Sequence, residues 1–227
     1  MKNYKCLAFL LMVSFFLLSS CVSSSKESDV IAVHDIQDNE LYTVDVELPV
    51  FEGQDNLNSL IAEQVDTWFN GFKQEIEQVS ANMANKKDLK GAFYIDWQLK
   101  QNSNEIISVL LSAYTYTGGA NGQDQLASFL WNKKEQSMIP LEQVLPSVVN
   151  PPNLERLAEQ CRTQLIEILE ASKDSFLEEM IKEGTLPVKD NFQVFTMSKP
   201  GITFYFTKYQ VAPGSYGIQE VFLPFLK

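Results

Sequence analysis

The sequence predicts an α+β fold made of two packed halves. In each half, a helix packs on one face of an antiparallel sheet. Two observations support this prediction. A long amphipathic pattern with helical spacing, from Leu57 to Met83, is followed by strand-like segments that short polar turns connect. Helical patterns then recur from Asn153 onward, and three more strand-like segments follow them. The expected order is therefore β-α-β-β-β in the first half and α-α-β-β-β in the second.

The first half begins with a strand and a long helix. Apolar and polar side chains alternate from Leu41 to Leu48, which is typical of a half-buried strand, and Pro49 and Gly53 end it. The following helix has one apolar stripe backed by charged residues, so we expect it to lie on a sheet and to place its aromatic residues in the core. The stripe comprises Leu57, Leu60, Ile61, Val65, Trp68, Phe69, Phe72, Ile76, Val79 and Met83.

Three strand-like segments come after this helix, and the short loops between them favour antiparallel pairing. They are Phe93–Leu99, Ile107–Ala113 and Leu126–Trp131. The glycine-rich stretch from Tyr114 to Gly122 lies between the second and the third. It lacks the G-x-x-x-x-G-K spacing and leads into a strand, so it is not a phosphate-binding loop. Its Gly-Gly and Asn-Gly pairs tolerate positive φ, which predicts a hairpin turn.

The second half is expected to place its helices before its strands. A short connector runs from Ile139 to Leu145 and ends at Pro146. One helical pattern begins at Asn153, and another begins at Ser175 and ends at Gly184. The apolar stripe of the first of these helices is Leu154, Leu157, Ala158, Cys161, Leu165, Ile168 and Leu169. The expected strands are Phe192–Met197, Ile202–Thr207 and Ile218–Phe225.

The N-terminus has the three-part form of a secretory signal. Lys2 and Lys5 precede an apolar run from Cys6 to Leu18, which is shorter than the roughly 20 residues that a membrane-spanning helix needs. Leu18-Ser19-Ser20-Cys21 resembles the bacterial lipobox, in which the cysteine is acylated; ordinary cleavage beside an incidental cysteine is the alternative. We therefore expect lipid attachment at Cys21, which would anchor the chain to a membrane of the bacterial cell envelope, on the extracytoplasmic side.

These patterns divide the chain into four segments. Residues 1–20 are predicted to be a lipoprotein signal peptide, and the small, polar residues 21–29 a flexible tether. Residues 30–138 are expected to form the N-terminal α+β half, and residues 139–227 the C-terminal α+β half. No long low-complexity linker separates the two halves, so we expect them to pack together.

Composition and residue types exclude several function classes. A net charge of −11 opposes binding to nucleic acid. His34 is the only histidine, and with Cys161 it cannot supply the ligands of a zinc site, so we expect no metal, cofactor or catalytic residue. Cys161 is most simply a small buried hydrophobe. Five carboxylates are the candidates for acid-base hydrolysis, although no pair stands out among Asp96, Asp124, Glu178, Glu179 and Glu220.

Three segments, in this order, resemble one family: YTYTGGANG (Tyr114 to Gly122), IPLEQVLP (Ile139 to Pro146) and FYFTKYQVAPGSYGIQEVFLPF (Phe204 to Phe225). The family is an extracytoplasmic two-part domain of unknown function. It occurs in lysozyme-sensing anti-sigma factors and ahead of some peptidoglycan deacetylase domains. The resemblance implies a recognition or sensing module without catalytic activity. The family's glycine motif usually reads Gly-Gly-Ala-His, and Asn121 replaces the histidine here.

We therefore predict a lipid-anchored envelope module that binds peptidoglycan or a cationic envelope protein such as a lysozyme. Tyrosine and asparagine make contacts at modest entropic cost. The candidate ligand-binding residues are Tyr114, Tyr116, Asn121, Tyr209 and Tyr216. The alternative for these side chains is that they only pack and cap turns. Two rival functions stay open, namely a carboxylate-dependent hydrolase of cell-wall glycans and a structural lipoprotein with a dedicated protein partner.

Overall fold

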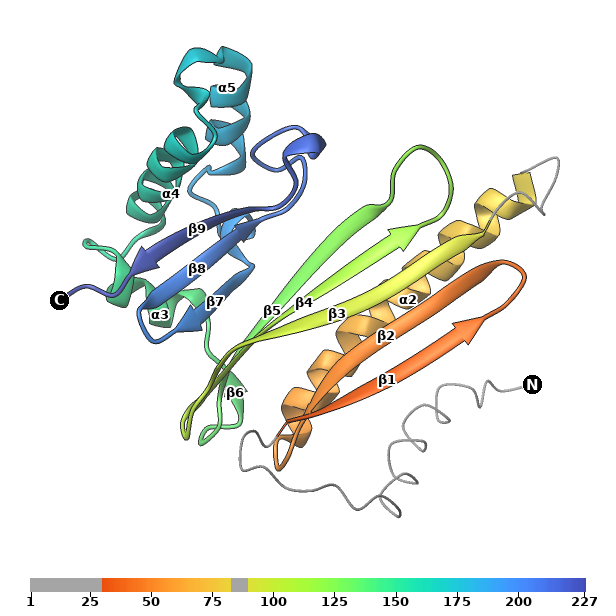
Figure 1. Cartoon of the computed structure of the whole chain (residues 1–227). Helices are drawn as coiled ribbons and strands as arrows, with labels where there is room; N and C mark the ends of the chain where they lie inside the picture. Colours follow the sequence, from red (N-terminus) through yellow and green to blue (C-terminus); the bar gives the residue numbers. More distant parts are fainter. Residues whose placement is uncertain (1–29, 83–89) are drawn as a thin grey trace.

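The computed structural model describes residues 30–82 and 90–227, which form a six-stranded sheet A and a three-stranded sheet B (Figure 1). The predicted α+β class is confirmed, because helices accompany a sheet in each half. The predicted signal peptide, Cys21, the tether and Met83 lie outside the described residues. For these segments the expectations above remain predictions.

Sheet A follows the order of the chain from one edge to the other. Its strands are β1 (Val30–Asp38), β2 (Tyr42–Phe51), β3 (Gly91–Asn102), β4 (Ile106–Tyr116), β5 (Gln123–Asn132) and β6 (Ser137–Met138). The pairings are antiparallel as predicted, except that β2 and β3 are parallel. Helix α2 (Asp55–Asn82) connects these two neighbours, and such a crossover returns the chain in its starting direction. The edge strands β1 and β6 were not predicted.

Helix α2 covers one face of sheet A (Figure 1). The buried part of its stripe is Leu57, Ile61, Val65, Trp68, Phe72 and Ile76. These residues form one core with inward-facing strand residues such as Phe93 and Val109. Phe69 packs against the same core, with its ring centroid 5.1 Å from that of Phe93. The aromatic residues of the stripe are therefore core residues, as the spacing predicted, whereas Leu60 is exposed.

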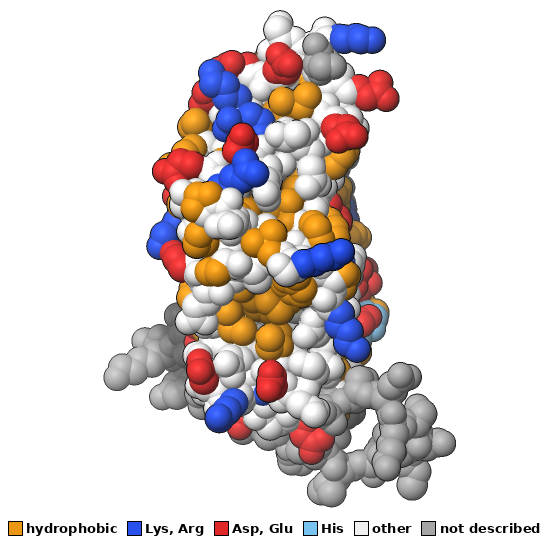
Figure 2. Space-filling view, turned by 90° about the vertical axis from the view of Figure 1, so that its left-hand side faces the viewer, with side chains coloured by type: hydrophobic (Ala, Val, Ile, Leu, Met, Phe, Trp, Pro, Cys, Tyr) orange, Lys and Arg blue, Asp and Glu red, His pale blue; other side chains and the backbone are white. Residues whose placement is uncertain are grey.

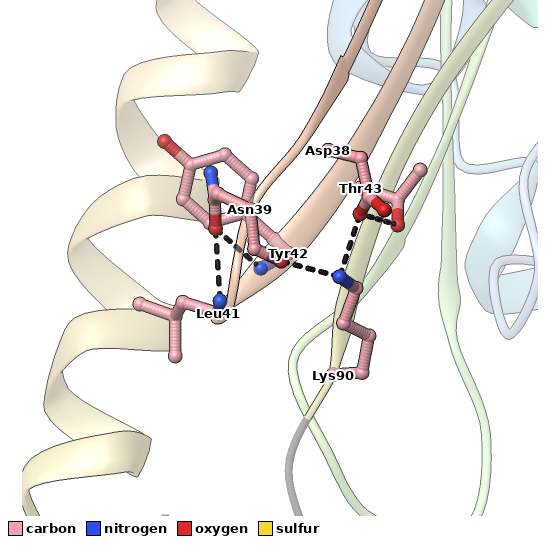
Figure 3. A network of polar contacts seen from close by, with 6 residues as sticks. All are labelled: Asp38, Asn39, Leu41, Tyr42, Thr43 and Lys90. Carbon is pink, nitrogen blue, oxygen red and sulfur yellow. Dashed lines mark hydrogen bonds and ion pairs between the residues drawn. The ribbon is translucent and has the colours of Figure 1, made fainter. Parts of the chain in front are cut away.

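The turn between β1 and β2 is held by a polar network (Figure 3). Asn39 Oδ1 accepts hydrogen bonds from the backbone N–H groups of Leu41 and Tyr42, at 2.8 and 2.9 Å. Lys90, just before β3, pairs with Asp38 at 2.6 Å and donates to the carbonyl oxygen of Asn39. The hydrogen bond from Lys90 lowers the pKa of Asp38. These contacts tie strand β1 to the start of β3.

The second half contains three helices and sheet B. The helices are α3 (Leu141–Val148), α4 (Leu154–Ile168) and α5 (Ser175–Gly184), and the strands are β7 (Phe195–Ser198), β8 (Gly201–Phe206) and β9 (Gln219–Pro224). Short 3-10 turns occur at Ala171–Lys173, Lys189–Phe192 and Gly214–Tyr216. Asn153 caps α4 as expected, because its side chain accepts a hydrogen bond from the backbone N–H of Arg156.

The predicted connector from Ile139 to Leu145 is wrong in one respect, because most of it is helix α3, with Pro146 inside the helix. Proline lacks the N–H that an internal helical position donates, which is why Pro146 was interpreted as an end point. Apolar residues three and four positions apart bury one face of this segment nevertheless. They are Leu141, Val144, Leu145 and Val148, and they belong to the second core.

The two halves meet where β7 crosses the outer face of sheet A, opposite α2. The backbone N–H of Met197 donates to Ser108 Oγ at 2.9 Å, and that of Phe195 donates to Ser128 Oγ at 3.0 Å. Ser108 is completely buried by this contact. Sheet B therefore covers only part of the outer face of sheet A, and the hairpin end of β4 and β5 extends beyond it (Figure 1).

The surface differs in polarity from one region to another. Figure 2 shows hydrophobic side chains gathered across the middle of one side of the molecule, with charged side chains mainly above, below and along the margins. Within residues 30–82 and 90–227, none of the helices combines the length and the apolar character that crossing a membrane requires.

Candidate functional site

A groove of about 470 Å³ lies on the face of sheet A opposite α2. Side chains alternate between the two faces of a strand, so most of the lining side chains point away from the α2 core, whereas Ile95 and Ala113 belong to it. The lining residues are His34, Asp45, Glu47, Tyr94, Ile95, Asp96, Ser112, Ala113, Tyr114, Asp124 and Ile218. Ile218 immediately precedes β9, so both halves of the chain contribute to the groove.

Two tyrosines and two carboxylates form a row across four strands of this groove. The strand register places Asp45 opposite Tyr94, Tyr94 opposite Tyr114, and Tyr114 opposite Asp124. Residues that are directly opposite project to the same face and interact. The rings of Tyr94 and Tyr114 are stacked, with centroids 6.0 Å apart and planes 16° apart. Their exposed fractions are 42% and 36%, so both rings remain accessible from solvent.

Each carboxylate at an end of this row has a basic partner from another element. His34 Nε2 on β1 lies 2.6 Å from Asp45 Oδ1. At the other end, Lys208 of the loop after β8 forms an ion pair with Asp124. The hydrogen bond to Asp124 raises the pKa of Lys208, and the nearby Tyr209 acts in the same direction. Lys208 is therefore an ammonium ion at neutral pH.

The two other carboxylates of the groove have no basic partner among the described residues. Glu47 Oε1 accepts a hydrogen bond from Trp97 Nε1 at 3.1 Å. Asp96 Oδ1 accepts one from the backbone N–H of Trp97 at 2.7 Å. Both donors are neutral, so the negative charges of Glu47 and Asp96 are not compensated by a cation within the part of the chain that the structure describes.

Two glycines allow tyrosine rings to lie against the backbone. A Cβ atom at Gly122 would overlap the ring end of Tyr114, and one at Gly214 would overlap the ring of Tyr209. Only a residue without a side chain permits these positions. Tyr209 also has a φ of 68°, in the left-handed region that residues other than glycine rarely adopt. Both glycines therefore leave room for a tyrosine ring to lie against the backbone.

The predicted ligand-binding residues fall into different environments. Tyr114 lines the groove, and Tyr209 is exposed beside the ion pair of Lys208. The hydroxyl of Tyr116 donates to the carbonyl oxygen of Gly119 at 3.1 Å. Tyr116 therefore caps the turn, which is the alternative role considered for these side chains.

Tyr114 is the only one of the five predicted residues that lines the groove, and the last two lie in turns. Asn121 is exposed in the turn between β4 and β5, where Gly118 and Gly119 have φ values of 114° and 96°. Tyr216 is exposed in the 3-10 turn before β9. The hairpin itself was predicted, and the antiparallel register of β4 and β5 confirms it.

Sequence reasoning did not select Tyr94, Asp45 and Glu47, although the alternation of the strands marks all three as outward-facing residues. Tyr94 occupies an outward position on a strand whose inward positions were recognised, and Asp45 and Glu47 occupy the polar face of β2. Asp96 and Asp124 were considered as carboxylates without an evident pair. The structure places both in the groove, whereas Glu178 and Glu179 are exposed on α5 and Glu220 is exposed on β9.

The groove does not contain a Ser-His-Asp arrangement, although Ser112, His34 and Asp45 all line it. Three strand spacings separate β1 from β4, which corresponds to roughly 14 Å. His34 contacts Asp45, whereas Ser112 Oγ donates to the backbone carbonyl of Asp96 at 3.5 Å. Among the residues that the structure describes, no three histidine, cysteine or acidic side chains are placed to hold a metal ion together.

Cys161 lies away from the groove, in the core of the second half. Its side chain is completely buried, and this burial raises the pKa of the thiol to about 12. The thiolate, which is the nucleophilic form, is therefore absent at neutral pH. The interpretation of Cys161 as a small buried hydrophobe agrees with this environment.

Two family models match the chain, one after the other. Residues 36–124 match the model described as Deacetylase PdaC, and residues 146–225 match the model of a protein family of unknown function, DUF3298. The tyrosine row of sheet A lies in the first match, and Lys208 and Tyr209 lie in the second. Ile218 of the second match also lines the groove, so both parts contribute to it, and the predicted resemblance to a two-part domain is confirmed.

One curated protein and two solved structures illustrate this similarity. The peptidoglycan-N-acetylmuramic acid deacetylase PdaC of Bacillus subtilis (strain 168) is 24% identical over 186 residues, which cover 82% of this chain but 38% of that protein. A DUF3298 family protein from Pseudomonas aeruginosa has a TM-score of 0.61 at 14% identity, covering 86% of this chain and 88% of that one. A DUF3298 member from Bacteroides fragilis has a TM-score of 0.57 at 17% identity, covering 86% and 89%. The two structures show that the fold is shared.

Proposed function

Since the chain carries a PdaC-like part followed by a DUF3298 part, we propose that it is a non-catalytic cell-wall module that binds peptidoglycan glycan in the groove of sheet A. The stacked pair of Tyr94 and Tyr114 between Asp45 and Asp124 carries this proposal. A sugar ring has an apolar C–H face and polar hydroxyl edges. An exposed aromatic ring can pack against the C–H face, and carboxylates can accept hydrogen bonds from the hydroxyl groups.

The name of the relative, which describes an enzyme that acts on peptidoglycan, supports the choice of a cell-wall ligand. This chain spans 38% of the length of that relative, so the relative's activity is not carried over to it. A groove of about 470 Å³ falls within the roughly 300–1,000 Å³ of small-ligand sites. A groove of this size can hold a glycan fragment, and the binding measurements below separate this ligand from a protein such as a lysozyme.

Replacing Tyr114 with alanine is expected to weaken binding of soluble peptidoglycan fragments by about tenfold or more, because half of the stacked pair is removed. Isothermal titration calorimetry measures the affinity directly. Tyr216→Ala is the matched control, because Tyr216 is also an exposed tyrosine but lies outside the groove. The proposal fails if the unaltered protein binds no fragment, or if Tyr114→Ala binds as tightly as the Tyr216 variant.

The same samples distinguish the rival functions. A carboxylate-dependent hydrolase would release new reducing ends from peptidoglycan during incubation, and we expect none. If lysozyme bound while glycan did not, the ligand would be a cationic protein. If the protein were a structural lipoprotein, it would bind neither lysozyme nor glycan. If sugar is released, and if Asp96→Asn or Asp124→Asn stops this release, the protein would be an enzyme and the proposal of a binding module would be wrong.

We also propose that Cys21 is acylated and anchors the module to a membrane on the extracytoplasmic side, as the lipobox-like sequence indicates. Cys21→Ala is expected to leave the protein soluble or unprocessed, which fractionation and metabolic labelling with palmitate would detect. Cys6→Ala, also within the export segment, should keep both label and anchoring. Normal processing and anchoring of the Cys21 variant would contradict the proposal.

A further inference from the structure

We infer that the groove selects glycan fragments that carry a free, protonated amine over equivalent fragments whose amines are all N-acetylated. The inference rests on the proposed glycan-binding function and specifies the charge of the ligand. Beside His34, four acidic side chains line the groove, and none of the lining residues is lysine or arginine. Such a lining attracts cations and repels phosphate and carboxylate groups.

The molecule already places an ammonium ion at one end of the tyrosine row. Lys208 pairs with Asp124, and the hydrogen bond to Asp124 raises the pKa of Lys208, with Tyr209 and Tyr114 acting in the same direction. Asp124, at the end of the tyrosine row, therefore already pairs with an amine.

Two further carboxylates of the groove, those of Asp96 and Glu47, have no lysine or arginine partner among the described residues. Asp96 lies two positions from Tyr94 on β3, so the two side chains project from the same face. Asp96 and Glu47 accept hydrogen bonds only from the neutral groups of Trp97 among the described residues. A sugar stacked on Tyr94 would bring an amino substituent toward these carboxylates.

An N-acetyl group would gain less in this place, because a neutral amide has no Coulomb attraction to Asp96 and Glu47. The amine could belong to a de-N-acetylated sugar or to a diamino acid of a stem peptide, and both share the same protonated group. For the sugar, hydrolysis of the N-acetyl amide is the class of reaction that supplies it, with water consumed and acetate released. The two sources are separated by the probes used.

The test compares two oligosaccharides of equal length, a fully N-acetylated chito-oligosaccharide and its fully de-N-acetylated form. At mildly acidic pH, where carboxylates are ionised and amines protonated, we expect about tenfold tighter binding of the amine form. Added salt should reduce the difference, because screening weakens partly exposed charge pairs. A peptide with a free diamino-acid side chain, without sugar, shows whether the amine is recognised outside a glycan.

The double variant Glu47→Gln/Asp96→Asn removes two charges but keeps the oxygens that accept from Trp97. We expect it to bind both oligosaccharides equally. The control Glu178→Gln/Glu179→Gln removes the same charge from an exposed helix and should keep the preference. Equal affinity of the unaltered protein for both forms, or equal loss of preference in the control, overturns the inference while glycan binding stands. If neither form nor peptidoglycan binds, the proposed function fails with it.

Discussion

Alanine in place of Gly122 is expected to lower the affinity for glycan by about tenfold or more while the fold stays intact. The added Cβ atom would overlap the outer end of the Tyr114 ring. That ring end belongs to a flexible side chain, so it can turn away without moving the backbone. Once displaced, Tyr114 no longer stacks on Tyr94, and the accessible pair is lost.

The expected result is therefore a loss of binding without a comparable loss of stability. Calorimetric titration gives the affinity, and thermal unfolding gives the stability, which we expect to change by less than about 1 kcal/mol. Gly71→Ala is the matched control, because a Cβ there meets nothing within 4 Å and α2 lies on the opposite face of the sheet. Wild-type affinity in the Gly122 variant would show that the position of the Tyr114 ring does not matter.

Much of the fold could be predicted because its cores follow simple periodicities. The stripe of α2 repeats at three- and four-residue steps, and the inward positions of β3 and β4 alternate, so local patterns were sufficient. Strand β1 has no such pattern, since both Ile31 and Ile36 are exposed. Its place depends on pairing with β2 and on the contacts of Lys90, which lies far along the chain.

The groove was harder to predict because it depends on strand register. Asp45, Tyr94, Tyr114 and Asp124 form a row only if three successive pairings have one particular alignment. A slip of one residue in any strand would turn its side chains to the other face. Tyr114 could be selected because it lies beside a recognisable hairpin. Tyr94 could not, because it resembles any outward residue until its partners are known.

The ion pair between Lys208 and Asp124 has a related explanation. Asp124 lies just after the β4–β5 hairpin turn, and Lys208 lies in the loop after β8, far along the chain. Packing of β7 across sheet A brings these loops together. The charge of each residue was visible in the sequence, but only the packing of the two halves makes them partners. A site at such a junction depends on tertiary contacts that local patterns do not contain.

Alanine in place of Gly184 is expected to produce a large loss of stability together with a loss of binding. A Cβ atom there would overlap the carbonyl oxygen of Gln210 and lie 2.7 Å from its carbonyl carbon. These are backbone atoms, so relief requires a movement of the chain. The side chain of Gln210 resists this movement, because its Nε2 donates to the carbonyl oxygens of Gly184 and Asn191 at 3.1 and 3.0 Å. Overpacking of this kind costs about 1–3 kcal/mol, and a backbone clash belongs at the upper end.

The loss should reach the groove, because Gln210 follows directly after Lys208 and Tyr209. A shift of this loop would separate Lys208 from Asp124 and lift the Tyr209 ring from Gly214. Urea denaturation measures the stability, and titration with the same glycan measures binding at a temperature where the variant is folded. Gly71→Ala again serves as control. An unfolding free energy within about 0.5 kcal/mol of the unaltered protein would contradict the rigid contact between α5 and this loop. Retained stability with lost binding would instead mean that the loop moves away from α5 without loosening the rest of the fold, so that only the position of Lys208 and Tyr209 depends on this contact.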